Sequence, residues 1–505
     1  MRLLFLAMVL TVGCRGGGPP DTAASGSEGI GRCRPAVYAG GFYPADPASL
    51  AGMVDSLLAL SGGTSPEGEM IAGVVPHAGY VYSGETAAAL YGALEGEDID
   101  IVILVGPSHQ VPLSGFSVFQ GSAYMTPLGE VPVDTEVAER LLGSHPSAEF
   151  VPAAHEAEHC LEVQLPFLQR VLAPGFAVVP VLVGEAREDE LRFMSELILA
   201  EAYGKRLLLL ASCDLSHYPD LETAMRVDSM TVGAVLEGDM TDFLEKTSRQ
   251  RLPDGLGTFA CGRQAVALAM AYAEFYPGAG RELLSMSTSA GFSGDSSRVV
   301  GYASMAFTST QADPGEWRIT EDSSRLLLEL ARSSVESSVL GLEMDVTDGL
   351  PEELALPRGA FVTLKRNGEL RGCIGSIRPL MPLSETVVTM AGSAALEDPR
   401  FIPVAPAELP GLDYEISVLT PLQILEDPDL VRVGTDGLLI LAPDGRSGVL
   451  LPQVPVEQGW GREEFLQRVC LKAGLPSDAY LGDVTIYRFQ AQILEGNGDE
   501  ARETQ

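Results

Sequence analysis

Basic residues are scarce in this chain. Its 505 residues include 33 Lys and Arg against 69 Asp and Glu, which gives a formal net charge of −36 at pH 7. A chain with this balance repels the phosphate backbone of nucleic acids, and no cluster of Lys and Arg creates a local exception. We therefore expect no nucleic-acid binding, and we interpret the acidity as a contribution to solubility.

Two further patterns are missing. Long apolar runs are absent after the N-terminus, and a membrane-spanning helix needs such a run. The seven cysteines form neither a CxxC pair nor a compact disulfide framework. The composition, 46% hydrophobic and 20% charged, is otherwise typical of a globular protein. Because 505 residues exceed one ordinary core, we expect two domains.

The N-terminus has the pattern of an export signal. Arg2 supplies a short positive region, Leu3–Leu10 supplies an apolar region, and small residues precede Cys14. Because this order resembles a bacterial lipoprotein signal, we expect residues 1–14 to form the signal, with Cys14 lipidated and the exported protein anchored to a membrane. Residues 15–32 then form a flexible tether rich in Gly, Pro and Ser. The alternatives are an N-terminal helix and a cytoplasmic protein.

The first domain is expected over residues 33–310, where strand-like apolar runs alternate with helical patterns. This alternation predicts an α/β fold with a mainly parallel sheet and helices on both faces. The predicted helices span Ala186–Tyr203 and Cys261–Tyr276. The predicted strands are Ile71–Val75, Ile99–Val105, Ala177–Val183, Leu207–Ala211 and Val299–Phe307.

A second domain of α+β type is expected over residues 320–494, after a linker at 311–319. It opens with a long amphipathic helix over Thr320–Leu342, because apolar residues recur there near helical spacing. Residues 495–505 are polar and acidic, and we expect them to be a frayed tail. The other predicted elements are strands at Gly359–Lys365 and Tyr414–Leu419 and a helix at Arg462–Ala473.

Histidine is also rare, and its placement is informative. All six histidines lie between His77 and His217, and three of them, including His109, closely follow predicted strands. Ligands of open α/β sheets bind in the crevice at the carboxyl ends of the strands. Histidines placed just beyond several strand ends therefore predict a functional site there.

His77 and His109 are the first candidate metal ligands. They are expected at equivalent positions after adjacent strands, and two neutral imidazoles suit a divalent transition metal. Gly79 would permit a close backbone approach or an unusual dihedral angle beside His77. Cys261 is a candidate third ligand, because a helix N-terminus lowers a thiol pKa and the thiolate binds metal. The equal alternative for Cys261 is a buried, inert thiol.

Asp214 and His217 are candidate acid–base residues. They stand three residues apart, so the carboxylate could hydrogen-bond to the imidazole and raise its basicity. This pairing predicts His217 as a proton acceptor oriented by Asp214.

A second acid–base candidate is His159, which directly follows Glu158. Glu158 and Glu162 have the spacing of one helix face, so a solvated amphipathic helix is the plain alternative for this segment. His145 and His155 lack such neighbours, and we interpret them as surface residues.

Five ordered motifs in the first domain resemble the Memo family from about Pro35 to Phe307. The resemblance implies a fold similar to LigB-type non-haem iron dioxygenases, which include protocatechuate 4,5-dioxygenase. It also implies metal on His77, His109 and Cys261, with Asp214 and His217 in the same pocket. Fe(II) is the expected metal, with copper or zinc as alternatives. The motifs are Pro76–Tyr80, Gly106–His109, Glu158–Pro166, Ser212–His217 and Cys261–Arg263.

The chain departs from those families at two cysteines. Cys160 replaces the serine that is more usual after the Glu-His pair. Cys261 stands where the dioxygenases have a carboxylate. Because a thiolate is softer and can itself be oxidised, dioxygenase activity does not carry over directly.

The second domain resembles the AMMECR family from about Thr320 to Leu494. Its segment Arg371–Gly375 contains Cys373 between glycines, and it could be a thiol site or a ligand-binding turn. We favour a tight glycine turn with a buried small thiol. The motifs that carry the resemblance are Leu370–Gly375, Leu450–Val454, Trp460 and Cys470–Leu475.

Together the two segments resemble the fused protein B type of the AmmeMemoRadiSam system. That resemblance implies a radical-SAM protein as partner, which conflicts with export, because an exported protein would not meet a cytosolic one. A homodimer is a further expectation for either domain.

The leading functional hypothesis is a metal-dependent redox enzyme acting on an unknown small substrate and oxygen. His217 would remove a proton from the substrate, His159 would assist, and Tyr80 and Arg263 would line the pocket. The alternative is a non-catalytic metal-binding or scaffold lipoprotein. A hydrolase is a weaker third option, because the strained glycine-framed turn of a serine nucleophile is missing.

Overall fold

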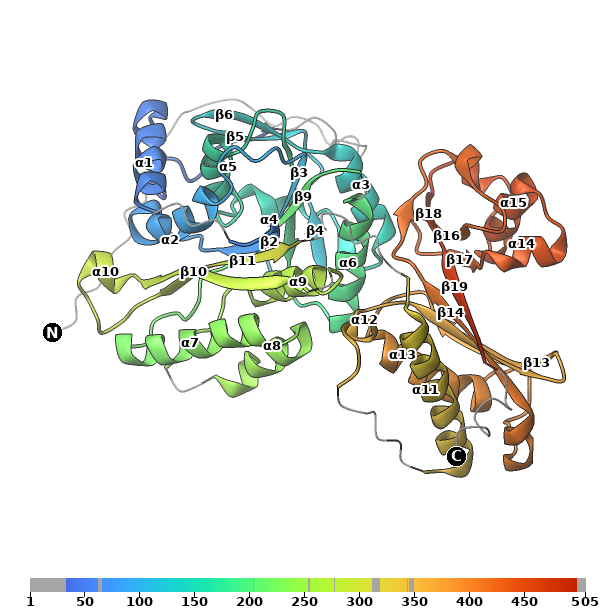
Figure 1. The fold of residues 1–505 in the computed structure, drawn as a ribbon. Helices are drawn as coiled ribbons and strands as arrows, with labels where there is room; N and C mark the ends of the chain where they lie inside the picture. Colours follow the sequence, from blue (N-terminus) through green and yellow to red (C-terminus); the bar gives the residue numbers. More distant parts are fainter. Residues whose placement is uncertain are drawn as a thin grey trace, which may run out of the picture.

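The computed structural model describes residues 33–496 except 62–65, 203, 253–254, 277, 311–317, 343 and 345–348. Cys14, the predicted signal and the predicted tether lie outside the described residues, as does most of the predicted linker. None of the described helices combines the length and apolar character that crossing a membrane requires. The chain forms two domains, which Figure 1 shows side by side.

An eight-stranded mixed sheet forms the centre of the first domain. Its four middle strands are parallel, whereas the β10–β11 pair and β4 run antiparallel to their inner neighbours. The predicted, mainly parallel sheet is therefore confirmed, with antiparallel pairings toward its edges. In spatial order the strands are β10 (Gly280–Thr288), β11 (Gly301–Ser309), β2 (Glu69–Val75), β9 (Leu207–Ser212), β3 (Ile101–Pro107), β8 (Ala177–Val183), β4 (Phe116–Val118) and β7 (Ala148–Glu149).

The expectation that His77 and His109 follow adjacent strands was wrong. Strand β9 lies between β2 and β3 and pairs with both in parallel. Sequence order does not give spatial order in a sheet with crossover connections, because a later strand can insert between two earlier ones. The end of β9, with Asp214, therefore lies between the two histidines.

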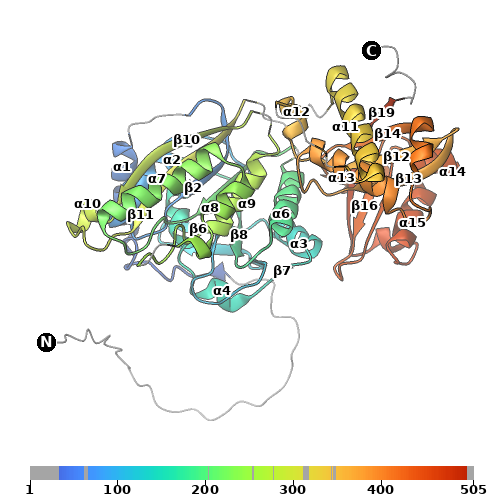
Figure 2. The ribbon, with the colours of Figure 1, turned by 90° about the horizontal axis from the view of Figure 1, so that it is seen from below.

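Helices cover both faces of this sheet (Figures 1 and 2). Aspartates start several of them, because the side chains of Asp46, Asp134, Asp220 and Asp239 accept hydrogen bonds from first-turn backbone amides. One face carries α1 (Pro47–Leu60), α2 (Tyr80–Gly92) and α5 (Leu165–Val171). The other carries α6 (Glu188–Glu201), α7 (Leu221–Glu237), α8 (Met240–Lys246) and α9 (Arg263–Ala273).

Smaller elements complete the first domain. A three-stranded sheet forms from β1 (Cys33–Arg34), β5 (Ala123–Thr126) and β6 (Gly129–Pro132). The remaining elements are α3 (Thr135–Ser144), α4 (Pro152–Glu156), the 3-10 helices η1 (Glu162–Gln164) and η2 (Arg249–Arg251), and α10 (Ala290–Ser293).

The second domain contains two antiparallel sheets, which confirms the α+β expectation. Its first helix, α11 (Glu321–Leu340), begins at the cap Thr320 and ends at Gly341, whose φ of 66° favours glycine. The first sheet has the order β13 (Glu369–Ser376), β12 (Ala360–Arg366), β14 (Leu412–Leu419) and β19 (Ala491–Gly496). The second has the order β15 (Gln423–Ile424), β18 (Thr485–Phe489), β16 (Gly437–Leu441) and β17 (Ser447–Leu450).

The other helices of this domain pack against these sheets. Helix α13 lies on β12 and β13 beside α11, and α15 lies on β16 and β17. These elements are α12 (Glu352–Ala355), α13 (Leu383–Leu396), η3 (Pro406–Gly411), η4 (Pro428–Leu430), α14 (Gln453–Gln458), α15 (Arg462–Lys472) and η5 (Ala479–Leu481).

The predicted glycine turn at Arg371–Gly375 was wrong, because this segment lies inside strand β13. Gly372 is required by packing and not by a turn, because a Cβ at this position would approach the Ala394 carbonyl oxygen to 2.1 Å. The glycine therefore lets α13 pack closely on the strand, and Cys373 is only half-buried. Glu495 and Gly496 belong to β19 and not to a frayed tail, and residues 497–505 lie outside the described residues.

The two domains share a hydrophobic core. Phe489 and Tyr487 of β18 belong to the same buried cluster as the sheet of the first domain. The Tyr487 hydroxyl donates to Ser144 Oγ at 3.0 Å, and the Arg378 guanidinium lies 4.0 Å from the centre of the Phe193 ring. The second domain is thus packed against α3 and α6.

Glu196 of α6 is buried near this contact. Glu196 is 2% exposed, and its Oε2 has no hydrogen-bond partner among the described residues. Burial raises the pKa of Glu196 to about 8, although the charges of Arg378 and Arg358 oppose the rise. The folded protein therefore keeps this carboxyl protonated at pH values where the unfolded chain has released the proton.

Replacing Glu196 with Gln should stabilise the protein more at pH 8 than at pH 5. A carboxyl with a raised folded pKa favours folding below its unfolded pKa, and this advantage is lost as the pH rises to about 8. At about 1.4 kcal/mol per pKa unit, the difference between the two pH values should be about 3 kcal/mol. Urea denaturation measures it, with the exposed Glu139→Gln as the matched control. Parallel pH profiles for wild type and Glu196→Gln would contradict the prediction.

Candidate metal centre

The pairing register brings three candidate residues to one edge of the sheet. Val75 pairs with Ser212, and Val105 pairs with Ala211, so the carboxyl ends of β2, β9 and β3 lie side by side. His77, Asp214 and His109 each stand two residues beyond the end of their strand. Position relative to the strand ends therefore explains why these side chains meet.

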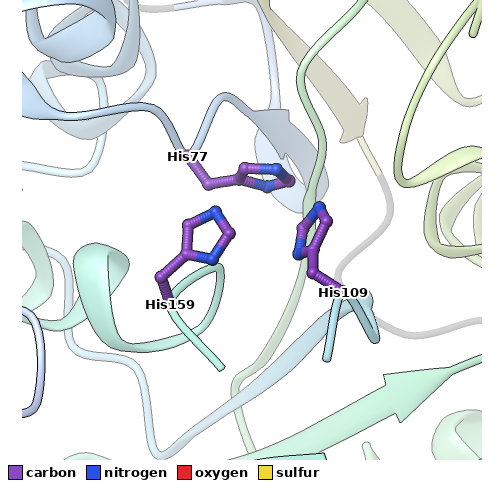
Figure 3. Close-up of side chains that lie close together, drawn as sticks. All are labelled: His77, His109 and His159. Carbon is purple, nitrogen blue, oxygen red and sulfur yellow. The ribbon is translucent and has the colours of Figure 1, made fainter. Parts of the chain in front are cut away.

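His159 joins them from the loop between α4 and η1. One potential ligand atom from each of His77, His109 and His159 lies within 4.8 Å of the others. The ring centre of His77 lies 5.1 Å from that of His109 and 5.2 Å from that of His159, and Figure 3 shows the three rings around one space. Sequence reasoning placed His159 near the site as an acid–base residue, and the structure makes it a candidate ligand as well.

The Glu158 carboxylate orients two of these imidazoles. Its Oε1 lies 2.8 Å from His109 Nδ1 and 3.1 Å from His159 Nδ1, and the carboxylate also accepts both residues' backbone N–H groups. Burial would raise the pKa of Glu158, but the hydrogen bonds from His109 and His159 outweigh it and hold the pKa well below its usual range. The ionised carboxylate thus favours protons on both Nδ1 atoms and leaves Nε2 free to bind metal.

His77 is oriented by Ser212. The His77 Nδ1 atom lies 3.0 Å from Ser212 Oγ, which donates to the Cys160 carbonyl oxygen and accepts from Gln164 Nε2. Because the serine proton is used, Nδ1 is the donor in the His77 contact and Nε2 keeps its lone pair. Burial lowers the pKa of His77, which also favours the neutral, metal-binding imidazole.

Cys261 lies at this site, just before α9. Its Sγ is 3.2 Å from His77 Nε2 and accepts from the Asp214 backbone N–H at 3.2 Å. The next residue must be small, because a Cβ on Gly262 would approach the Ser212 carbonyl oxygen to 2.5 Å. Cys261 is half-buried, so the full burial of the alternative interpretation was wrong, and its Sγ contacts a candidate ligand.

The expected Asp214–His217 pair does not form. Asp214 Oδ1 instead accepts from the His77 backbone N–H at 2.7 Å. Burial is the main cause that raises the pKa of Asp214. His217 Nε2 is buried without a hydrogen-bond partner among the described residues. Burial would lower the pKa of His217, but the nearby Cys261 and Asp214 raise it.

The segment around Glu162 is buried rather than solvated. Glu162 accepts from Arg34 Nη1 at 2.6 Å, from two backbone amides and from the Tyr43 hydroxyl at 2.5 Å. The solvated-helix alternative was therefore wrong, because i, i+4 spacing also fits carboxylates that are buried against a cation. Arg34 also donates to the Glu158 carbonyl oxygen, and no sequence signal singled it out.

His145 and His155 are also buried, so their assignment to the surface was wrong. His145 lies between the rings of Phe116 and Phe193, and burial lowers its pKa to about 4. His155 Nε2 lies 3.0 Å from Ser117 Oγ, and burial lowers the pKa of His155 to about 3. Both are neutral core histidines, which no feature of the sequence distinguishes from exposed ones.

Tyr80 and Arg263 were predicted to line the pocket because they adjoin candidate site residues in the sequence, and the structure places them differently. Tyr80 is a core residue whose hydroxyl donates to the Val163 carbonyl oxygen at 2.6 Å, so its predicted place in the pocket was wrong. Arg263 does line a cavity, together with Cys261. Cys160 is buried, and its thiol donates to the Pro107 carbonyl oxygen at 3.3 Å.

The donor set fits a transition metal. Three imidazoles with anchored Nδ1 atoms and a thiol beside them are suitable donors for such an ion. A second group, His109, Glu158 and Cys160, has similar spacing. It fits less well, because Glu158 already faces five donors and burial raises the pKa of the Cys160 thiol.

Fold and site define an α/β protein with a histidine-rich candidate metal centre at the carboxyl edge of its sheet. The profile of the Memo-like protein family matches residues 34–306, and that of AMMECR1 matches residues 328–494. The chain therefore belongs to the Memo family and carries an AMMECR1 domain at its C-terminal end.

Relatives match one part of the chain each. A MEMO1 family protein of Archaeoglobus fulgidus is 38% identical over 278 residues, which cover 53% of this chain and 97% of the relative. A protein of Methanothermobacter thermautotrophicus is 46% identical over 188 residues, which cover 36% and 97%. An uncharacterised Pyrococcus horikoshii protein of known crystal structure is 42% identical, with a TM-score of 0.33, over 35% of this chain and 92% of its own.

Replacing Glu158 with Gln should weaken metal binding by about 10- to 100-fold, the usual effect of removing a carboxylate that orients ligating histidines. The amide is similar in shape but neutral, so the two imidazoles lose the charge that holds their protons on Nδ1. Competition with a metal chelator measures the affinity. The exposed Glu156→Gln is the control, and unchanged affinity in Glu158→Gln with unchanged thermal stability would contradict the assignment.

Proposed function

We propose that this chain is a metal-dependent redox protein that acts on a small substrate. The observation that carries the proposal is the convergence of His77, His109 and His159, with Nδ1 anchored in each ring, beside Cys261. His77, His109 and Cys261 would hold the metal. His159 is either a further ligand or the base beside it.

Fe(II) is the proposed ion, and copper and zinc are the alternatives. Imidazole suits all three, whereas a thiolate favours softer ions and donates more charge than the carboxylate of LigB-type dioxygenases. The bound metal would polarise the substrate and support its oxidation. A redox role is therefore proposed without the ring-cleaving reaction of those dioxygenases.

Proton transfer is assigned to His217. Its Nε2 is buried and has no partner among the described residues, so it is available to a bound substrate. The neighbouring Cys261 and Asp214 favour the protonated ring, which makes His217 able to hold a proton taken from that substrate. Asp214 acts electrostatically and through the His77 backbone, since it forms no hydrogen bond with His217.

The second candidate is a non-catalytic metal-binding or scaffold protein. The contact between the Cys261 thiol and His77 supports it, because thiolates retain metals tightly. The extensive packing between the domains also suits a scaffold.

Metal analysis of the anaerobically purified chain tests the proposal. We expect about one iron or copper per chain, lost in His109→Ala and in Cys261→Ser. His159→Ala should lose the metal if His159 is a ligand, and should keep the metal but lose turnover if it is a base. Controls are His145→Gln and Cys373→Ser, which alter a histidine and a cysteine elsewhere. A folded protein without metal would overturn the proposal.

Oxygen consumption with catechol-like compounds separates the two candidates. A redox enzyme should show turnover that falls in His217→Ala while metal content stays constant. A binding protein should retain metal tightly and consume no oxygen beyond the rate of the metal-free protein.

We also propose membrane anchoring through Cys14 and association with a radical-SAM protein. Both rest on sequence resemblance, and they compete for the compartment of the protein. Expression in a bacterial host with labelled palmitate tests the anchor: we expect label in the membrane fraction and none in Cys14→Ser. A Cys33→Ser control should stay labelled, and an unlabelled wild-type protein in the soluble fraction would favour the cytosolic partner instead.

A further inference from the structure

A cavity of about 790 Å³ lies beside the candidate metal centre. Cys261 forms part of its wall, and so do Pro107 and Ser108, which immediately precede His109. The cavity therefore begins at Cys261 and at the residues before His109, and it continues along the start of α9. Its position suits a molecule whose one end reaches the metal centre.

Arg263 is the partly buried cation of this cavity. Its Nε donates to Thr247 Oγ1 at 3.0 Å and its Nη2 donates to the Leu244 carbonyl oxygen. Nη1 donates to no group among the described residues, and no described carboxylate lies within 4.0 Å of the guanidinium. The guanidinium therefore has no carboxylate in contact with it among the described residues, and the charges of Glu185 and Glu188 act on it only from farther away.

The other charges of the cavity are balanced. Arg249 lies 3.7 Å from Glu185, with both side chains largely exposed, and Arg251 pairs with Glu245. These two pairs cancel, so the net positive charge of the wall comes from Arg263. In a chain with a formal net charge of −36, such a place is unusual and would attract anions.

The rest of the wall contains both polar and apolar groups, and its apolar part suits an organic molecule better than an inorganic ion. Phe259, Leu113, Leu252 and Val183 give the cavity apolar surface. No side chain caps the first turn of α9, whose residues also line the cavity, so its backbone amides add to the positive end. Apolar surface within a wall whose one unpaired cation is Arg263 suits a ligand with an apolar body and a single negative group.

We propose that this cavity binds a small organic carboxylate, with its carboxylate on Arg263 and its body directed toward the metal centre. The inference names a substrate class for the proposed function. It rests on that function only in taking the far end of the bound molecule to react at the metal. Carboxylate binding itself needs the cavity and Arg263 alone.

Benzoate and benzamide test the proposal on the full chain. They have nearly the same shape, but only benzoate is an anion. Isothermal titration should show benzoate binding at least tenfold more tightly than benzamide. Arg263→Gln should lose this preference, and Arg263→Lys should keep part of it, since the charge remains without the fork of donors. Arg249→Gln, at the exposed and paired rim, should change benzoate affinity less than twofold.

Equal affinity for benzoate and benzamide in the wild-type protein would overturn the proposal without any variant. An equal loss in Arg249→Gln and Arg263→Gln would also overturn it, because that result indicates general charge attraction. Metal content separates it from the proposed function. Metal without benzoate preference refutes the carboxylate site alone, and benzoate preference without metal refutes the metal-dependent function alone.

Discussion

The candidate metal centre depends on one buried carboxylate. Glu158 lies within hydrogen-bonding distance of the Nδ1 atoms of His109 and His159 and accepts their backbone N–H groups, so it fixes both the position and the tautomer of two imidazoles. A buried carboxylate is costly unless it is paired, and here the paired groups are the candidate ligands themselves. Removing the carboxylate would therefore remove the hydrogen bonds that hold the loop in this conformation.

Arg34 and Glu162 in turn support that loop. Arg34 donates to Glu162, to the Glu158 carbonyl oxygen and to the His155 carbonyl oxygen, so the start of the described chain is tied to the loop that carries His159. A guanidinium has five donors in a fixed fork, which suits one cation for joining several acceptors in a buried segment. The metal centre is consequently built from the sheet edge on one side and from this ion-paired loop on the other.

Sequence reasoning found the residues that follow strand ends and missed those that act through burial. His77, His109 and Asp214 could be predicted because apolar strands with polar residues just beyond them leave a visible pattern. The insertion of β9 between β2 and β3 could not be predicted, because strand order depends on long-range pairing. Burial of His145, His155 and Glu162 also left no local signal, since hydrophobic periodicity reports apolar residues and not the partners of buried polar ones.

Helices α6 and α9 connect the second domain with the candidate metal centre. Helix α6 contacts α9, whose N-terminal end follows Cys261, and α6 also carries Phe193, which contacts Arg378 of the second domain. Packed helices transmit displacement because protein interiors are close-packed. A continuous packed route therefore runs from the AMMECR1 domain to the thiol of the candidate site. Whether energy is coupled along it is a separate quantity, which a double-mutant cycle between Arg378 and Cys261, read out as metal affinity, would measure. A coupling energy of zero would mean that the second domain stabilises the first without affecting its site.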